Sequence, residues 1–114
     1  MDDDCIFCKI VAGQIPAQIV HRDDDVVVIT DVNPQAPQHL LVMPVQHWPN
    51  LPALSESGSQ ELVAKLFAVA SQFGRKRGER GFRLVANTGP AGGQTVDHLH
   101  IHVLAGRDMT WPPG

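Results

Sequence analysis

The stretch His98-Leu99-His100-Ile101-His102-Val103-Leu104 carries the clearest pattern in the sequence. In an extended strand, successive side chains point to opposite faces of the sheet. The alternation therefore predicts a strand over residues 98–104, with three histidines on one face and aliphatic side chains between them in the core. Three polar rings give an aliphatic strand no packing benefit, so the pattern favours a functional site over an incidental cluster of histidines.

A glycine-rich segment, Gly89-Pro90-Ala91-Gly92-Gly93, lies upstream of the histidines and predicts a turn after a strand over residues 82–87. Glycine lets backbone N–H groups approach an anion closely, and the nearby Thr95 adds a hydroxyl donor. Imidazole is a metal ligand and, when neutral, a nucleophile, so the histidines alone leave metal catalysis and covalent catalysis open. The adjacent loop indicates a phosphate beside them.

The remaining patterns predict an α+β fold. Apolar, β-branched runs flank three aspartates and predict a hairpin, and apolar side chains at three- and four-residue steps predict a long helix that packs on a sheet. The predicted strands cover residues 19–22, 26–30, 39–45, 82–87 and 98–104, and the predicted helices cover 5–11 and 55–77. Arg75-Lys76-Arg77-Gly78 ends the long helix and is interpreted as a solvated helix terminus rather than an anion site. We therefore expect a five-stranded, mainly antiparallel sheet with one long and one short helix.

Composition and charge limit the class of protein. The 114 residues and 43% hydrophobic content predict one domain over residues 1–114 with one core. A net charge of −3 argues against a nucleic-acid partner that is held by phosphate neutralisation. The aliphatic runs are far shorter than a membrane span requires. The acidic start Met1-Asp2-Asp3-Asp4 does not resemble a secretory leader, so we expect a cytoplasmic protein.

Cys5 and Cys8 are the two cysteines of the chain, and their spacing admits three interpretations. A redox pair belongs on a strand-to-helix turn of a βαβ unit, which this pattern lacks. Buried unreactive thiols are a second alternative. A structural zinc ion is favoured, because such sites often take two thiolates from this spacing and two imidazoles from elsewhere. The nearest imidazoles are those of His47, after the third predicted strand, and His98.

Several motifs together resemble one family. They are Cys5-Ile6-Phe7-Cys8-Lys9-Ile10, Asp31-Val32-Asn33-Pro34-Gln35-Ala36-Pro37-Gln38-His39, Gly92-Gly93-Gln94 before the histidines, and Trp111-Pro112-Pro113-Gly114 at the end. With the histidine stretch they resemble the histidine-triad (HIT) superfamily and, through the C-terminal motif, its Hint branch of nucleoside phosphoramidases. The resemblance covers almost the whole chain. It implies a HIT-like fold, a homodimer whose sheets join into one larger sheet, and a purine nucleoside monophosphate bound beside the histidines.

The resemblance implies covalent catalysis at His100. This middle histidine is similar to the family's nucleophile, which attacks the α-phosphorus of a purine nucleoside phosphoramidate, cleaves its P–N bond and forms a nucleotidyl-histidine intermediate. Water then releases the nucleoside monophosphate. His102 and His39 would contact the non-bridging oxygens, and the backbone at Gly93 to Thr95 would supply further donors. No catalytic metal is required for this step.

The resemblance also implies contacts with the rest of the substrate. Asp31 is similar to a carboxylate that binds the ribose hydroxyls, and Asn87 to an asparagine that orients the phosphate and the leaving group. Thr95 stands where the family usually carries serine, and it would donate a hydrogen bond to the leaving group. The apolar slot for the base would be formed by Ile6, Phe7, Ile10, Ile29 and Val32, and the remaining expected substrate-binding positions are Gly93, Gln94 and Trp111.

Some bacterial HIT proteins are similar in combining a Cys-x-x-Cys pair with histidines that include the first of the triad. This implies a structural zinc ion held by Cys5, Cys8, His47 and His98. The sequence departs from the Hint pattern at Asp97, where an aromatic residue is common, and at Ala105, where glycine is common. Two alternatives to the phosphoramidase stay open: a nucleotide-binding regulatory module with incidental hydrolysis, and a hydrolase of dinucleoside polyphosphates.

Overall fold

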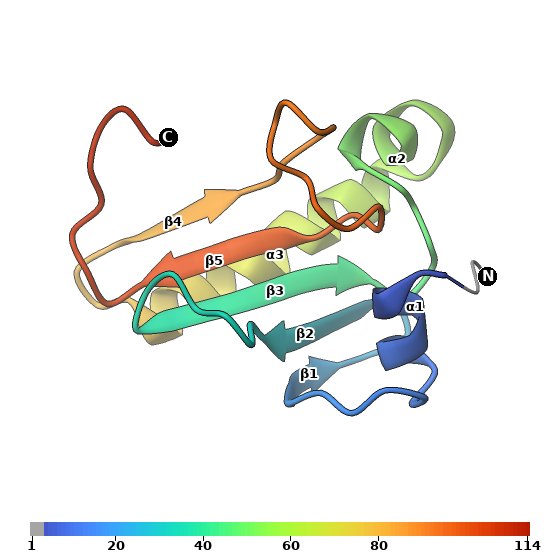
Figure 1. The fold of residues 1–114 in the computed structure, drawn as a ribbon, viewed down its shortest axis with the longest axis horizontal. Coiled ribbons are helices and arrows are strands. Elements are labelled where there is room, and N and C mark those ends of the chain that lie inside the picture. Colours follow the sequence, from blue (N-terminus) through green and yellow to red (C-terminus); the bar gives the residue numbers. More distant parts are fainter. Residues whose placement is uncertain (1–3) are drawn as a thin grey trace.

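A computed structural model describes residues 4–114, so most of the acidic run at the N-terminus, residues 1–3, lies outside the described residues. The helices are α1 (Ile6–Val11), α2 (Leu51–Ser57) and α3 (Gln60–Arg77), and the strands are β1 (Ile19–Arg22), β2 (Val26–Thr30), β3 (Gln38–Pro44), β4 (Phe82–Val85) and β5 (Ile101–Ala105). The strands form one antiparallel sheet in the order β1-β2-β3-β5-β4 (Figure 1). The expected α+β class and five-stranded sheet are confirmed. Within residues 4–114, no helix is long and apolar enough to cross a membrane.

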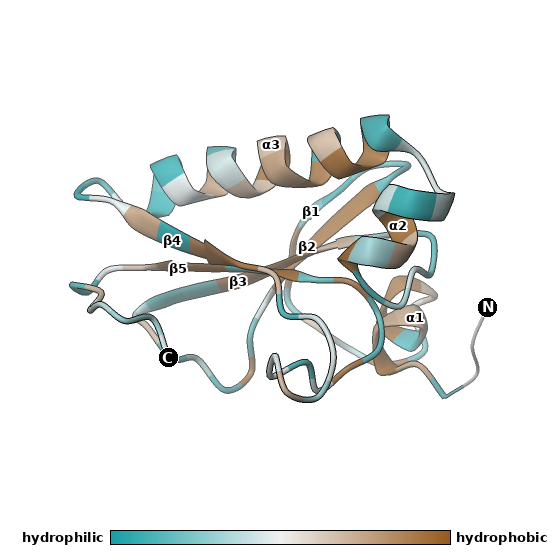
Figure 2. Ribbon diagram, turned by 90° about the horizontal axis from the view of Figure 1, so that it is seen from above, coloured by the Kyte–Doolittle hydropathy of each residue, from teal (hydrophilic) through white to brown (hydrophobic). Residues whose placement is uncertain are grey.

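The sheet separates two packing layers (Figure 2). On one face, α3 turns its hydrophobic side to the sheet, and its Leu66 is buried in one cluster with Leu40 of β3 and Ile101 of β5. On the other face, α1 packs in a second cluster with Leu41 and Met43, which alternate along β3 with the residues of the first cluster. Because strand residues alternate between faces, the histidines of β3 and β5 lie on the face that carries α1.

The hairpin and the third strand form where aliphatic runs predict them. β1 and β2 have the predicted bounds, and β3 starts and ends one residue earlier than predicted. Asp23 stabilises the hairpin turn, because its carboxylate accepts from the backbone N–H groups of Asp25 and Val26 at 2.8 Å each. Lys65 of α3 donates to Asp23 at 3.2 Å and to Asp25 at 2.8 Å, which ties the turn to the helix.

The expectation of one helix over residues 55–77 is wrong at its start, because two helices form there. Asn50 caps α2 and Ser59 caps α3, and each side chain accepts a backbone N–H from the residue three positions on. Gly58 separates the helices, and a Cβ at this position would lie only 2.8 Å from the Trp48 side chain. A second N-cap within an apolar periodic segment starts a new helix, so the structure has three helices rather than two.

The last strand begins three residues later than expected, at Ile101. Pro44 ends the neighbouring strand β3 and has no N–H to donate. The carbonyl of Pro44 accepts from the ring of His98 at 2.9 Å, and the N–H of Leu99 donates outside the sheet, to the carbonyl of Trp48 at 2.6 Å. The alternation still holds through this segment, because Leu99 is buried in the same cluster as Ile101. β4 is also shorter than expected and ends at Val85.

Candidate active site and metal site

The three expected catalytic histidines gather on the face of the sheet that carries α1. His39 comes from β3, His102 from the neighbouring β5, and His100 directly precedes β5. The ring centroids of His39 and His102 lie 5.2 Å apart, and those of His100 and His102 lie 5.0 Å apart. The pairing of β3 with β5 thus joins side chains that are distant in the sequence.

His100 is held so that one ring nitrogen can face a substrate. A carbonyl oxygen only accepts, so the 2.8 Å contact with the carbonyl of His98 places the proton on Nδ1 and the lone pair on Nε2. Burial lowers the pKa of His100, and the bond to the carbonyl and the charge of Asp31 oppose this shift. The imidazole is therefore neutral near pH 7, which is the form that acts as a nucleophile.

The backbone N–H of Gln35 determines which ring nitrogen carries the proton in His39 and, through His39, in His102. The N–H of Gln35 donates to Nδ1 of His39 at 2.9 Å, so the proton of the neutral ring lies on Nε2. Nε2 of His39 lies 2.9 Å from Nδ1 of His102 and donates to it. The proton of His102 therefore lies on Nε2. Burial, together with the neighbouring His100 and His39, lowers the pKa of His102 to about 4, so this ring is also neutral at pH 7.

His39 and His102 form a hydrogen-bonded pair beside Asp31 rather than a metal site. One ligand atom of each lies within 4.8 Å of the others. Both ring nitrogens of His39 are already engaged, however, and a metal would need one of them deprotonated and released. One oxygen of Asp31 lies 3.4 Å from Nε2 of His39, and the other accepts from the N–H of Asn33 at 2.7 Å.

The glycine-rich loop is shaped by the buried side chain of Gln94. Its Oε1 accepts from the N–H of Gly89 at 3.0 Å, and its Nε2 donates to the carbonyls of Pro49 at 2.6 Å and Val96 at 3.0 Å. These bonds occupy the side-chain amide, and the backbone N–H groups of Gly93 and Gln94 also donate within the loop, to the carbonyls of Pro90 at 3.1 Å and Gly89 at 3.0 Å. The side chains and backbone expected to contact the phosphate lie around it: Gly93 has a φ of 88° and is exposed, Thr95 is exposed, and Asn87 is half-buried.

Replacement of Gln94 by Leu is expected to lower the free energy of unfolding by about 1–3 kcal/mol, because it removes the three hydrogen bonds of a buried side chain. Urea denaturation measures the change. Gln72→Leu, on the exposed side of α3, is the matched control and is expected to change stability by less than about 0.5 kcal/mol. Equal stability of the two variants would show that the loop does not depend on the Gln94 amide.

The expected base slot is only partly assembled. Phe7, Ile10 and Ile29 are buried in the cluster around α1, and the Phe7 ring lies edge-on to His100 with centroids 5.0 Å apart. Ile6 is 45% exposed and Val32 is 98% exposed, so the latter has almost no contact with the rest of the slot. Trp111 is 84% exposed in the C-terminal segment.

Cys5, Cys8, His47 and His98 form the expected cluster. Nδ1 of His98 lies 3.3 Å from Sγ of Cys5, 3.4 Å from Sγ of Cys8 and 3.3 Å from Nδ1 of His47. Sγ of Cys8 lies 3.2 Å from Nδ1 of His47. α1 begins at this cluster, because Sγ of Cys5 caps it by accepting from the N–H of Cys8 at 3.2 Å. The short helix therefore carries two of the four donor atoms.

The donor set fits a tetrahedral zinc ion. Zinc–sulfur and zinc–nitrogen bonds of normal length place tetrahedral donors about 3.3–3.8 Å apart, close to the separations in the cluster. His98 is fully buried, and its Nε2–H donates to the carbonyl of Pro44 at 2.9 Å, so its Nδ1 lone pair faces the other donors. A backbone carbonyl on the second ring nitrogen is the usual partner of a metal-bound histidine.

Sequence reasoning did not identify which main-chain groups orient these rings, namely the N–H of Gln35 and the carbonyls of His98 and Pro44. They belong to the main chain, which every residue type carries. The turn residues of the segment Asn33-Pro34-Gln35-Ala36-Pro37 gave the one available signal, since they predict a tight loop before His39.

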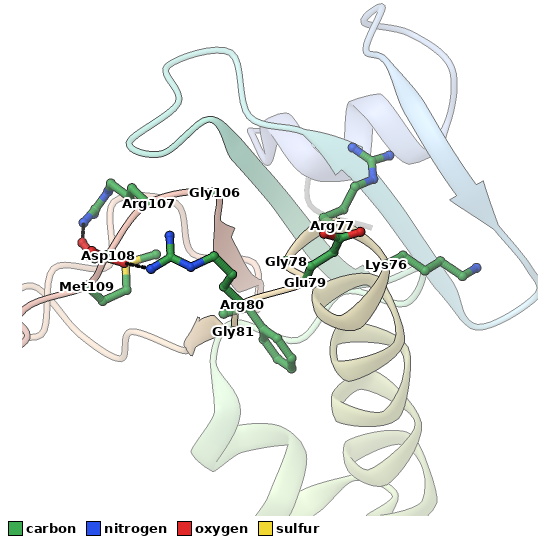
Figure 3. Close-up of a pocket in the computed structure, with 11 residues that line it drawn as sticks. Lys76, Arg77, Gly78, Glu79, Arg80, Gly81, Gly106, Arg107, Asp108 and Met109 are labelled. Carbon is green, nitrogen blue, oxygen red and sulfur yellow. Dashed lines mark hydrogen bonds and ion pairs between the residues drawn. The ribbon is translucent and has the colours of Figure 1, made fainter.

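One cavity lies away from the histidines. It measures about 670 Å³ and is lined by the end of α3, the start of β4 and the turn after β5 (Figure 3). Its cations have partners: Arg80 binds Asp108 at 2.9 Å, Arg107 donates to the carbonyl of Gln35 at 3.0 Å, and Arg77 donates to the side chain of Gln38 at 2.9 Å. This arrangement agrees with a solvated helix terminus.

The sequence and the fold are similar to known proteins. A family model described as HIT domain matches residues 12–109. The chain is 49% identical over 115 residues to an uncharacterized HIT-like protein of Synechococcus elongatus, with 100% of both chains covered. It is 42% identical over 115 residues to a 14 kDa zinc-binding protein of Zea mays, covering 99% of this chain and 90% of that relative. The structure of a HIT family hydrolase from Legionella pneumophila Philadelphia 1 matches with a TM-score of 0.91 and 42% identity, covering 97% of this chain and 100% of that one.

Proposed function

The chain belongs to the HIT domain family, and we propose that it is a hydrolase of the nucleoside phosphoramidase type, as in the Hint branch. Its substrate is a purine nucleoside phosphoramidate, and the bond cleaved is the P–N bond at the α-phosphate. The observation that carries the proposal is the bond from Nδ1 of His100 to the carbonyl of His98, which leaves a neutral imidazole with its Nε2 lone pair available. Phosphorus is the electrophile that such a lone pair attacks in covalent nucleotidyl transfer.

The reaction proceeds in two displacements. Nε2 of His100 forms a bond to the α-phosphorus while the P–N bond breaks, and the amine leaves with the electron pair of that bond and a proton from water. A water molecule then attacks phosphorus, the bond to Nε2 breaks, and the electron pair returns to the imidazole while a proton passes to solvent. The products are the amine, the nucleoside monophosphate and neutral His100.

The neighbouring groups stabilise the charge that develops on the phosphoryl oxygens. His102 carries its proton on Nε2 and donates it as a hydrogen bond to a phosphoryl oxygen. His39 was expected to contact these oxygens too, but both of its ring nitrogens are engaged, so it acts by fixing the tautomer of His102 through the 2.9 Å bond to Nδ1. Of the expected backbone donors at Gly93 to Thr95, the N–H groups of Gly93 and Gln94 donate within the loop, so the N–H of Thr95 would serve the phosphate. The Thr95 hydroxyl bonds the leaving amine. Asp31 accepts from the ribose hydroxyls, and Asn87 orients the phosphate.

The four-residue cluster would hold a structural zinc ion. The donor set fits zinc, and the similar maize protein is a zinc-binding protein. The ion would cross-link α1 to the segments that carry His47 and His98, and it would take no part in the phosphoryl step. Reduced thiols are required for this role, which agrees with a cytoplasmic protein.

The proposal is tested with the purified zinc-loaded protein, with adenosine 5′-phosphoramidate and diadenosine tetraphosphate assayed side by side. We expect kcat/KM to be at least about tenfold higher for the phosphoramidate, a difference of roughly 1.4 kcal/mol in transition-state binding. The reverse preference would identify a dinucleoside polyphosphate hydrolase. Saturable binding of AMP without turnover of either compound would identify a binding module.

The pH dependence of the reaction is a further prediction. Burial lowers the pKa of His100 below its ordinary value of 6.5, so the nucleophile stays neutral as the pH falls through that value. We expect kcat/KM to fall to half of its maximum only below pH 6.5, with folding and bound metal verified at each point. A half-maximal rate at pH 6.5 or above would contradict the buried, neutral imidazole.

A homodimer is part of the proposal, and β4 supports it. This strand lies at the edge of the sheet, with β5 as its one neighbour in the strand order. Its four residues are half-buried, and an unpaired strand edge is an open surface for a second chain. Pairing of two β4 strands would join the sheets of two copies. Light scattering at micromolar concentration is expected to give twice the chain mass of 12.4 kDa, and the single-chain mass at every concentration would contradict the dimer.

A further inference from the structure

The metal cluster and the proposed nucleotide site share one short helix. Cys5 caps α1 and Cys8 lies within its first turn, so two metal ligands bracket Phe7, a wall of the expected base slot. α1 has six residues, and a helix of this length is not stable alone in water. Its position therefore depends on the donor cluster and on the apolar contacts below it.

The two sites also share His98. Its buried ring is fixed on one side by the sulfur atoms of Cys5 and Cys8 and on the other by the carbonyl of Pro44. Its own carbonyl accepts the Nδ1–H of His100 at 2.8 Å. A shift of this residue would move the group that orients the nucleophile.

Phe7 contacts both histidines. Its ring meets His98 edge-on with centroids 5.9 Å apart and an interplanar angle of 78°, and it meets His100 with centroids 5.0 Å apart and an angle of 84°. One side chain thus lies against a metal ligand and the nucleophile together.

We propose that the metal ion and the nucleotide bind with positive cooperativity, and that His98 and Phe7 are the positioning residues that link the two sites. The inference rests on the proposed function, because it requires a nucleotide beside His100. A metal on the cluster orders α1 and His98 before the nucleotide binds. Less conformational entropy is then lost when the nucleotide binds, so its affinity is higher. Coupling between two ligands is reciprocal, so the nucleotide strengthens metal binding by the same factor.

The first test measures the affinity for AMP by calorimetry in the zinc-loaded protein and in the folded metal-free protein. We expect the dissociation constant to rise about tenfold when zinc is removed. Equal affinity in the two forms would overturn the cooperativity and leave the proposed function intact. No AMP binding by the loaded protein would overturn both.

A second measurement decides the matter if the metal-free protein does not fold. The zinc affinity of the loaded protein is measured by competition with a chromophoric chelator, with saturating AMP and without it, against a blank of AMP and chelator alone. We expect zinc to bind about tenfold more tightly with AMP present. An unchanged zinc affinity would overturn the proposal.

Phe7→Leu separates positioning from a general effect on the base slot. It keeps all four metal ligands and an apolar side chain but removes the ring edge that contacts both histidines. We expect the ratio of zinc affinities with and without AMP to fall from about ten towards one. Phe67→Leu is the matched control, because Phe67 packs on the cluster beneath α3, and it should keep the full ratio. A full ratio in Phe7→Leu would exclude Phe7 as the link.

Discussion

Replacement of His100 by Ala is expected to lower turnover of adenosine 5′-phosphoramidate by on the order of 10³-fold or more, because the reaction loses the group that forms the bond to phosphorus. Binding of AMP should change little, since Asp31, the loop at Gly93 and the base slot remain. Steady-state kinetics and calorimetry measure the two effects separately. Rapid quench of the wild-type protein with a labelled substrate should show an acid-sensitive label on this histidine.

His21→Ala is the matched control for that experiment. His21 lies on β1, where it binds Asp23 at 2.9 Å and contacts the ring of Phe73 on the α3 side of the sheet. Its replacement should leave kcat/KM within a few-fold of the wild-type value. Undiminished turnover by the His100 variant, or label on another residue, would end the covalent mechanism.

Loss of the metal is expected to have the largest effect on stability. Cys8 is 1% exposed and its sulfur lies 3.2 Å from His47 and 3.4 Å from His98. A ligand that binds only the folded chain adds about 2.7 kcal/mol at a concentration 100 times its dissociation constant. For a chain of this size that corresponds to a rise in Tm of roughly 10 °C. Calorimetric scans of the metal-free and zinc-loaded protein measure it.

Cys8→Ser provides the matched comparison, because serine keeps the size of the side chain and lacks the thiolate. The variant is expected to melt near the temperature of the metal-free wild-type protein, and added zinc should raise its Tm by no more than a few degrees. The same Tm for the wild-type protein with and without zinc would show that the cluster does not hold a structural metal.

The parts of the fold that depend on local patterns were predictable. The aliphatic runs give β1 and β2 their bounds, and the alternation at residues 98–104 correctly separates Leu99, which packs beneath α3, from His100. Apolar periodicity did not predict that α2 and α3 are separate helices. The apolar pattern continues across the break, and the only local sign of it is the capping residue Ser59. The late start of β5 depends on Pro44, which lies in a different strand.

The candidate site, like the fold, has parts that the sequence predicted and parts that it did not. The sequence named Cys5, Cys8, His47 and His98 as a group, and the structure places their donor atoms together. It offered no reason to expect that main-chain groups, among them the distant carbonyl of Pro49, occupy the Gln94 amide, or that Val32 is almost fully exposed. Both depend on how segments meet in space. The roles of the individual residues in binding a nucleotide stay predictions.

By itself, then, the sequence determined which side chains share a face and which metal donors are available, because strand alternation and residue chemistry are local properties. The tertiary structure alone decided which nitrogen of each histidine carries the proton. For His98 the choice is made by the carbonyl of Pro44, and for His102 by His39, and both partners are distant in the sequence. For His39 and His100 it is made by main-chain groups of Gln35 and His98, which are near in the sequence but face the rings only in the backbone conformation of the folded chain. Backbone donors and acceptors are the same in every residue other than proline, so their placement leaves no trace in the order of side chains.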